Sequence, residues 1–304
     1  MSTAPHSAAP LPSLVDSVLV VAPPDSGPGS WAGAPSAVLS EGVVHLAYRL
    51  RRPIGMGRGI RNVVASSTDG VHFRTVAEVS STMFDAASLE RPALVRTPDG
   101  RWRLYVSCAT PDSKHWRVDL LEASCPEELP LAEPVTVLPG TDSLAVKDPV
   151  VLEHGGQWHL WASVHPTEVW DEADRMTTDY ATSPDGVAWT WHGTVLAGRP
   201  GEWDARGVRV TAVVVDGDGV VATYDGRATA EQNWEEVTGT ATGTLGADGL
   251  VGPLTATDRP PLRSPHALGG LRYLSALPLD DGGTRVYYET ARPDGAHELR
   301  TEVV

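Results

Sequence analysis

The chain has 304 residues, of which 24 are Lys or Arg and 39 are Asp or Glu, so its formal net charge at neutral pH is −15. This balance argues against nucleic acid and against an anionic membrane as partners. The sequence has no apolar run of membrane-spanning length and no basic segment followed by an apolar core at its N-terminus, so we expect a cytoplasmic protein without a signal peptide.

The two cysteines, Cys108 and Cys125, are too few for a disulfide framework. We expect two reduced thiols, with a single bridge between them as the alternative. Neither cysteine has a His or Cys neighbour at the spacing of metal ligands. The sequence also has no compact His or carboxylate cluster of ligand spacing, so we expect no metal site, with a single Ca²⁺ or Na⁺ in a central channel as the alternative, and no cofactor.

The chain begins with a segment rich in Ala, Pro and Ser, and we expect residues 1–12 to form a loose tail. Residues 14–21, with the sequence LVDSVLVV, then have the apolar pattern of a β-strand. No neighbouring segment supplies a partner for this strand, so we expect its partner to be distant in the chain.

Three later segments share one pattern, in which a proline precedes an apolar run, a glycine-containing turn and a strand that holds an aromatic residue. They are GAPSAVLSEGVVHLAYR, ERPALVRTPDGRWRLYVS and KDPVVLEHGGQWHLWAS. Their prolines, Pro35, Pro92 and Pro149, follow one another at intervals of 57 residues. A fixed period indicates an array of like units, and two weaker copies lie at residues 209–226 and 271–290.

Short, evenly spaced strands without helical periodicity predict an all-β fold, and we interpret the five units as the blades of a five-bladed β-propeller formed by residues 1–304. The predicted blades cover residues 22–80, 81–140, 141–200, 201–258 and 259–304. The last unit supplies only three strands. We therefore expect residues 14–21 to add the fourth strand and to close the ring.

A propeller binds ligands at the mouth of its central channel, where the first strand of each blade begins. Alignment of the five units places one set of residues at this mouth: Ala34, Glu90, Arg91, Lys147, Asp148, Arg209, Arg272 and Tyr273. The predicted ring combines a few carboxylates with several arginines.

The segment KDPVVLEHGGQWHLWAS resembles the Asp-Pro strand of the five-bladed glycosidases, glycoside hydrolase families 43, 62, 32 and 68. The segments APSAVLSEGVVHLAYR and ERPALV are similar to the mannoside phosphorylases of family 130. This resemblance covers all five units in outline. It implies a propeller glycosidase with a blade-one aspartate as base or nucleophile, the Asp-Pro aspartate in blade three and a blade-four glutamate as acid.

Only Asp148 matches this set, in the role of the Asp-Pro aspartate that holds the sugar or tunes the acid. Ala34 occupies the blade-one position, and Arg209 lies near the blade-four position. Glycoside hydrolysis usually needs two carboxyl groups, for which Glu90 and Asp204 are the candidate partners of Asp148. Strand alternation turns Glu90 away from Asp148, whereas Asp204 lies on a loop where it could instead cap backbone amides.

Arg91, Arg209 and Arg272 need negative partners, because unpaired buried cations carry a heavy desolvation cost. The partners are either the candidate carboxylates, in a structural network, or a carboxylate or phosphate group of the ligand. The segment RLRRPIGMGRGIRN adds arginines on a glycine-rich loop, which suits either a phosphate or a solvated basic hairpin.

Trp31, Trp203 and Tyr273 lie at or near the starts of first strands and are candidates for sugar binding. His266, just before the fifth unit, is an alternative acid, base or ligand-binding group. These residues predict a hydrolase-like enzyme that processes a small saccharide or glycoside, neutral or anionic. Two alternatives stay open: a catalytically altered sugar-binding protein, and a phosphorylase or non-glycosidic tailoring enzyme on the same scaffold. The sequence does not indicate an oligomeric state.

Overall fold

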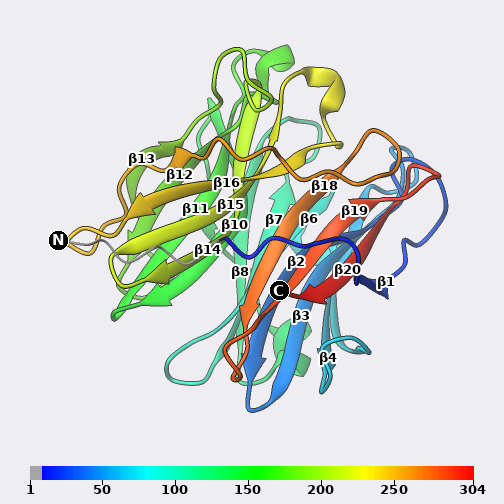
Figure 1. Ribbon diagram of the computed structural model, residues 1–304. Helices are drawn as coiled ribbons and strands as arrows, with labels where there is room; N and C mark the ends of the chain where they lie inside the picture. The colour runs from blue at the N-terminus through cyan, green and yellow to red at the C-terminus, as the bar shows by residue number, and fades with distance from the viewer. Residues whose placement is uncertain (1–8) are drawn as a thin grey trace.

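The computed structural model describes residues 9–304 and is almost entirely made of β-strands (Figure 1). Three sheets have four strands each, and a fourth sheet has eight. The expected all-β fold is confirmed. Both cysteines are free thiols, and no helix in the described residues is long and apolar enough to span a membrane.

The strands follow one another in antiparallel groups, each beginning with a segment that the repeats predict as a first strand. The first group is β2 (Trp31–Ser40), β3 (Val43–Arg51), β4 (Gly59–Ser67) and β5 (Arg74–Ser80). The second is β6 (Leu89–Arg96), β7 (Trp102–Ala109), β8 (Trp116–Ala123) and β9 (Val135–Leu138). The third is β10 (Leu144–His154), β11 (Gln157–Pro166), β12 (Thr177–Ser183) and β13 (Thr190–Leu196).

The fourth group is β14 (Gly207–Asp216), β15 (Gly219–Arg227), β16 (Val237–Thr244) and β17 (Thr255–Ala256). Four short 3₁₀ helices connect strands: η1 (Ser81–Phe84), η2 (Pro126–Leu131), η3 (Trp170–Glu172) and η4 (Ala230–Gln232). Most connections between paired strands contain glycine or aspartate, as in Glu41–Gly42 and Gly155–Gly156, whereas the longer connections that hold η2 and η4 contain neither.

The fifth group joins the two ends of the described chain. It consists of β18 (Leu271–Pro278), β19 (Thr284–Ala291) and β20 (His297–Val303). The N-terminal β1 (Val18–Val21) runs antiparallel to β20, with Val18 opposite Thr301, and Figure 1 shows the two strands side by side. A single parallel pair, Trp31 with His297, links β20 to β2 and merges the fifth and first groups into the eight-stranded sheet.

Apolar side chains fill the space between neighbouring groups, and five pairs of groups share a core in this way. Leu104 packs with Val64 between the second and first groups, and Tyr105 with Leu160 between the second and third. Similar cores join the third to the fourth group, the fourth to the fifth and the fifth to the first. Each fully buried large apolar side chain contributes about 2 kcal/mol. The first strands consequently contact one another in chain order, and β18 contacts β2.

Candidate functional site

The first strand of every group departs from regular pairing at one point close to its start. The irregularities lie between Gly33 and Ser36, Leu89 and Pro92, Lys147 and Val150, Val210 and Ala212, and Arg272 and Ser275. Ala34, Asp148 and Tyr273 take left-handed backbone conformations there, with φ of 54°, 56° and 54°. Because a β-bulge re-aims adjacent side chains, these points explain how residues of five strands turn toward one place.

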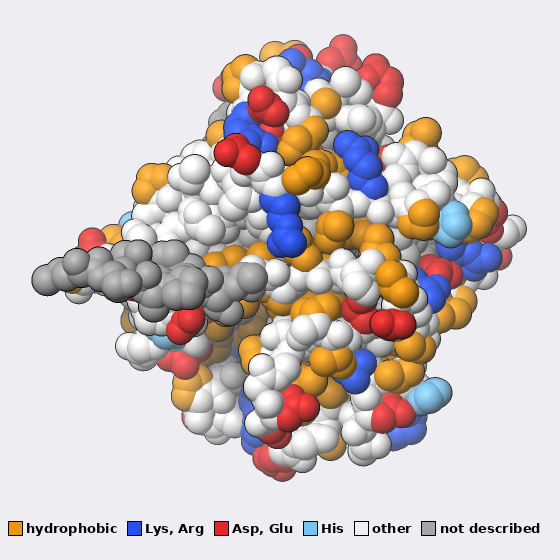
Figure 2. Space-filling view, viewed as in Figure 1, with side chains coloured by type: hydrophobic (Ala, Val, Ile, Leu, Met, Phe, Trp, Pro, Cys, Tyr) orange, Lys and Arg blue, Asp and Glu red, His pale blue; other side chains and the backbone are white. Residues whose placement is uncertain are grey.

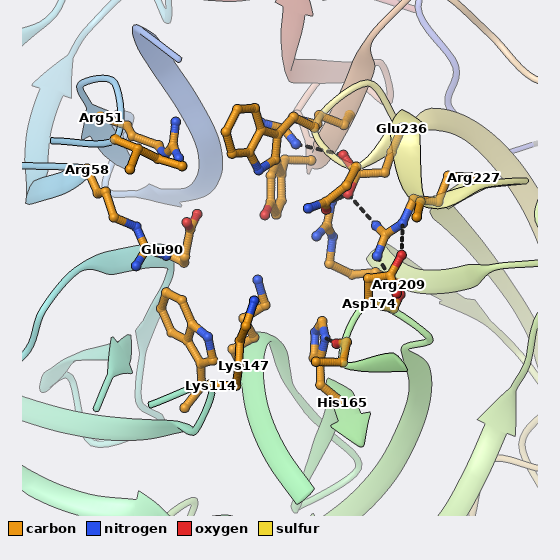
Figure 3. A pocket seen from close by; sticks show the side chains of 18 of the residues that line it. Arg51, Arg58, Glu90, Lys114, Lys147, His165, Asp174, Arg209, Arg227 and Glu236 are labelled. Atoms are coloured by element: carbon orange, nitrogen blue, oxygen red, sulfur yellow. Dashed lines mark hydrogen bonds and ion pairs between the residues drawn. The ribbon is translucent and has the colours of Figure 1, made fainter. Parts of the chain in front are cut away.

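A cavity of about 450 Å³ lies at this place, and all five groups or their connecting loops line it (Figure 3). Eight lining side chains are basic: Arg49, Arg51, Arg58, Lys114, Lys147, Arg209, Arg227 and Arg272. Four are acidic: Glu90, Asp171, Asp174 and Glu236. On the outer face shown in Figure 2, by contrast, acidic and basic side chains are interspersed. The basic excess in the lining of so acidic a protein favours an anionic ligand.

Two buried glutamates hold most of the arginines on one side of the cavity. Glu236, just before β16, accepts hydrogen bonds from Arg227 Nη1 at 2.7 Å and Arg272 Nη1 at 2.6 Å. Glu289, on β19, accepts from Arg272 Nε at 2.8 Å and Arg49 Nη2 at 2.9 Å. Burial alone would raise the pKa of both carboxyl groups, but the arginines hold it well below its usual range. Both glutamates are therefore ionised and serve as counter-ions.

Asp148 is fully buried behind the cavity lining. Its Oδ2 accepts hydrogen bonds from Arg209 Nη1 at 3.2 Å and from the Tyr273 hydroxyl at 3.3 Å, and Lys147 Nζ lies 3.6 Å away. Burial opposes ionisation, but the positive charges of Lys147 and Arg209 outweigh it and lower the pKa of Asp148 to about 2. The carboxylate is thus a fixed anion that positions Arg209 and Lys147.

Arg91 lies deeper than the cavity, where it spans two groups of strands. Its Nη2 donates to the carbonyl oxygens of Pro35, on β2, at 3.3 Å and Thr211, on β14, at 2.6 Å. The side chain is buried and is not part of the cavity lining. Burial lowers its pKa to about 10, so the guanidinium stays charged at neutral pH.

His165, at the end of β11, is part of the cavity lining and has one ring nitrogen without a partner among the described residues. Its Nδ1 lies 2.8 Å from the carbonyl oxygen of Ala173, which only accepts, so we assign the ring proton to Nδ1. Nε2 is then a buried acceptor, and no polar atom of the described residues pairs with it. Burial, reinforced by the charge of Lys147, lowers the pKa of His165 to about 3 and keeps the ring neutral.

Lys147 is the lining cation whose protonation changes nearest to neutral pH. Burial lowers its pKa to about 8, although the charge of Asp148 acts in the opposite direction. Its ammonium lies 4.8 Å from the centre of the Trp116 ring. At neutral pH Lys147 is therefore protonated in most molecules, and its ammonium group lies beside both an aromatic ring and the cavity.

Aromatic rings pack against several of the lining cations. The Arg272 and Arg51 guanidinium carbons lie 4.4 and 4.0 Å from the Trp31 ring centre, and the Trp234 ring centre lies 4.7 Å from the Arg51 guanidinium carbon. Tyr273 lies 3.8 Å from the guanidinium carbon of Arg209. These cation–π contacts orient the guanidinium groups without neutralising them.

The structure brings together most of the residues that the repeats place at the channel mouth. The lining includes Glu90, Arg209, Arg272, Trp31 and Tyr273, while Asp148 and Arg91 lie behind it. Glu90 forms an ion pair with Arg49 and points into the cavity in Figure 3. Strand alternation turns Glu90 away from Asp148, and in the structure Glu90 and Lys147 line the cavity whereas Arg91 and Asp148 lie behind it.

Three of the expected residues lie outside the lining of this cavity. Asp204 accepts a hydrogen bond from the Tyr224 hydroxyl at 2.7 Å and pairs with Arg199. Trp203 stacks on the same tyrosine, with ring centres 5.4 Å apart. His266 is exposed beside a second, smaller cavity of about 250 Å³. Asp204 and Trp203 thus belong to the packing around β15.

Several lining residues come from parts of each group that the repeat alignment did not consider. Lys114 and Trp116 lie at the connection into β8, His165 ends β11, and Arg227 and Glu236 flank the connection from β15 to β16. In an antiparallel group the second strand ends where the first begins, so these connections lie at the same edge. This rule of antiparallel pairing is the sequence signal that could locate these residues.

Among the described residues, no group of three or more His, Cys, Asp or Glu side chains is arranged to hold a metal ion.

Several solved structures are similar to this chain in fold. The α-L-arabinofuranosidase from Lactobacillus brevis matches with a TM-score of 0.68 at 14% identity, covering 90% of each chain. A thermostable family-43 glycoside hydrolase matches with a TM-score of 0.67 at 14% identity, and the match covers 94% of this chain and 91% of the hydrolase. The β-1,2-mannobiose phosphorylase from Listeria innocua matches with a TM-score of 0.66 at 17% identity, and the match covers 93% of this chain and 92% of the phosphorylase. No protein-family model and no curated protein matches the sequence. The chain therefore resembles these glycoside hydrolases and phosphorylases in fold.

Proposed function

We propose that the chain is a single five-bladed β-propeller and that β1 closes its ring. The five groups of strands are the blades, and the fifth is completed by the antiparallel pairing of β1 with β20. Two observations support a ring: the five shared apolar cores, and the contact between β18 and β2. The cavity then lies at one mouth of the central channel.

On this scaffold we propose a glycoside-processing enzyme that acts on a small anionic saccharide or glycoside. The observation that carries the proposal is the cavity itself, with eight basic lining side chains and the rings of Trp31, Trp116 and Tyr273. Aromatic rings suit the faces of a sugar, and arginines suit its anionic group. The fold shared with glycoside hydrolases and a mannobiose phosphorylase supports the same reaction class.

Hydrolysis requires a proton donor at the leaving oxygen and a group that activates water. Asp148 is unsuited to donate, because Lys147 and Arg209 keep it ionised. We assign proton donation to Lys147, whose Nζ gives a proton to the leaving oxygen as the glycosidic bond breaks. Glu90, the lining carboxylate on a first strand, takes a proton from water as the water oxygen bonds to the anomeric carbon. Asp148 acts as a positioning residue for Lys147 and Arg209.

A second candidate is a sugar-binding protein without turnover. It is favoured by Ala34 and Arg209 at the positions of two catalytic carboxylates and by the ion pair of Glu90 with Arg49. A phosphorylase is the third candidate, favoured by the basic lining, with phosphate in place of water as the attacking group.

Turnover and binding measurements separate these candidates. The protein is incubated with panels of neutral, uronic and phosphorylated glycosides, with and without inorganic phosphate, and products are separated by chromatography. Free sugar indicates hydrolysis and sugar 1-phosphate indicates phosphorolysis. Glu90→Gln and Lys147→Met should each abolish turnover and keep ligand binding, whereas Glu202→Gln, at an exposed site outside the cavity, should change neither. Binding without turnover of any glycoside by the unmodified protein would exclude both enzyme candidates.

A further inference from the structure

The cations of the cavity divide into those that have a carboxylate partner and those that do not. Arg209 pairs with Asp148 and Asp225, and Arg227 pairs with Glu236. Likewise, Arg272 pairs with Glu236 and Glu289, Arg49 with Glu90 and Glu289, and Lys147 with Asp148. The charge on this side is already compensated by the protein.

Arg51 and Arg58 have no such partner. Within residues 9–304 neither guanidinium forms an ion pair with a carboxylate, and the Nε of each is buried without a hydrogen-bond partner. Among the described residues, the one side-chain hydrogen bond of Arg51 goes from Nη1 to the carbonyl oxygen of Gly29, at 3.1 Å. Burial and the neighbouring arginines, including Arg49, Arg272 and Arg58, lower the pKa of Arg51 to about 9.

The fold holds this uncompensated charge in place. Arg51 is only 2% exposed and packs against the rings of both Trp31 and Trp234. Arg58 reaches the same side of the cavity from the loop between β3 and β4, as Figure 3 shows. Lys114 also lacks a carboxylate partner among the described residues, but it is exposed, so water solvates its charge. A buried unpaired arginine is costly unless a ligand supplies the missing anion.

We propose that Arg51 and Arg58 form a subsite for a phosphate monoester carried by the sugar, so that the substrate is a phosphorylated saccharide. Two unpaired guanidinium groups carry two positive charges, which match the charge of about −1.5 to −2 on a phosphate monoester at neutral pH. A sugar carboxylate would supply only one negative charge. The planar guanidinium also matches the oxygens of a phosphate in a bidentate contact. This inference rests on the proposed function of the cavity as a saccharide site.

The subsite also orients the substrate. Arg51 and Arg58 lie on the side of the first group, whereas Lys147 and His165 come from the third group (Figure 3). A sugar whose phosphate contacts the two arginines therefore extends across the cavity toward Lys147 and His165.

Isothermal titration calorimetry with defined probes tests the subsite. The probes are hexose 6-phosphates, the parent hexoses, glucuronate and inorganic phosphate. We expect at least one hexose phosphate to bind more tightly than its parent hexose, glucuronate and inorganic phosphate. Arg51→Met and Arg58→Met, which retain an apolar side chain, should each weaken that binding about tenfold or more and leave hexose binding unchanged. The matched control is Arg52→Met, because Arg52 is exposed, lies 3.6 Å from Asp25 and does not line the cavity.

Each other outcome overturns the inference. Equal weakening of hexose and hexose phosphate by Arg51→Met would show a structural role. Inorganic phosphate binding as tightly as every hexose phosphate would assign the subsite to free phosphate instead. Circular dichroism and thermal unfolding show whether Arg51→Met folds. If it does not, the test uses Arg58→Met and Arg51→Lys, because a lysine keeps the positive charge but cannot make the bidentate contact of a guanidinium. Calorimetry measures binding and does not depend on turnover. A protein that binds hexose phosphates as expected but has no activity would therefore contradict only the proposed enzyme function, not the phosphate subsite.

Discussion

Arg91 and Asp148, which occupy the same position in successive repeats 57 residues apart, meet in the folded protein. The backbone N–H of Arg91 donates to Asp148 Oδ1 at 3.3 Å. Asp148 thus joins the second group of strands to the third, while its other oxygen contacts Arg209 and Tyr273 of the fourth and fifth groups. Through this one side chain the third group contacts three of the other four groups.

Asp148→Asn should destabilise the protein at pH 7 by about 3 kcal/mol, because it leaves Lys147 without its carboxylate partner and leaves Arg209 with Asp225 as its main partner. The native pKa of about 2 lies below the usual value of an aspartate, so this contribution is present above pH 4 and is lost as pH falls toward 2. Urea unfolding at pH 7 and at low pH measures it. Asp216→Asn, at the exposed end of β14, is the control. Equal stability of the two variants would contradict a central role for Asp148.

Lys147→Met should change how stability depends on alkaline pH. The native pKa of Lys147 is about 8, below the value of about 10.4 in an unfolded chain, so between these values the unfolded state binds more protons. Stability from Lys147 therefore rises with pH across this window, by at most about 1.4 kcal/mol per pH unit. The difference between unfolding free energies of the two proteins, measured at several pH values, should show this slope. A flat difference would mean that Lys147 is not desolvated.

His165→Asn should remove an acid-sensitive contribution. The pKa of His165 is about 3 in the native state and about 6.5 in the unfolded chain. Between pH 6.5 and pH 3 the unfolded state therefore binds more protons, and the contribution of neutral His165 to stability is lost progressively as pH falls. Asn retains an N–H that can donate to the Ala173 carbonyl. The loss of stability between pH 7 and pH 4 should therefore be smaller in His165→Asn. Nitrogen NMR of the imidazole should find the proton on Nδ1, and a proton on Nε2 would refute the assigned tautomer.

Gly33→Ala should disrupt the ion pairs around Glu289. A Cβ at Gly33 would overlap the Glu289 carboxylate, which Arg49 and Arg272 contact. Moving this carboxylate breaks a buried network, and we expect a loss of about 2–4 kcal/mol. Gly252→Ala is the control, because the nearest atom to its Cβ is 3.8 Å away. Chemical denaturation compares both, and equal effects would argue against the predicted overlap.

Deletion of residues 1–21 tests the proposed closure of the ring. It removes β1 and exposes the edge of β20, which should promote association between molecules and lower the unfolding temperature. Size-exclusion chromatography and thermal unfolding measure both effects. Replacement of residues 9–12 by a glycine–serine segment leaves β1 in place and serves as the control. A monomeric deletion variant of unchanged stability would show that β1 is dispensable for the sheet.

The repeats predicted the first strands because their β-branched runs and turns recur at a fixed interval, and first-strand positions such as Arg209 and Tyr273 accordingly reach the cavity. A loop pattern, by contrast, does not reveal that Tyr224 and Arg199 hold the carboxylate of Asp204 outside the cavity lining. Glu236 was missed because it precedes a third strand, where the repeats are weakest. Local patterns thus located strands, whereas pairing between distant side chains depended on the assembled sheets.

The position of Arg91 affects how a ligand can enter and leave the cavity. Its guanidinium, bonded to β2 and β14, ties these strands together behind the cavity lining. In the proposed propeller we therefore expect a ligand to enter and leave on one side. Such a site would accept a short molecule or the tip of a longer one, whereas a polymer would not thread through it and be processed along its length.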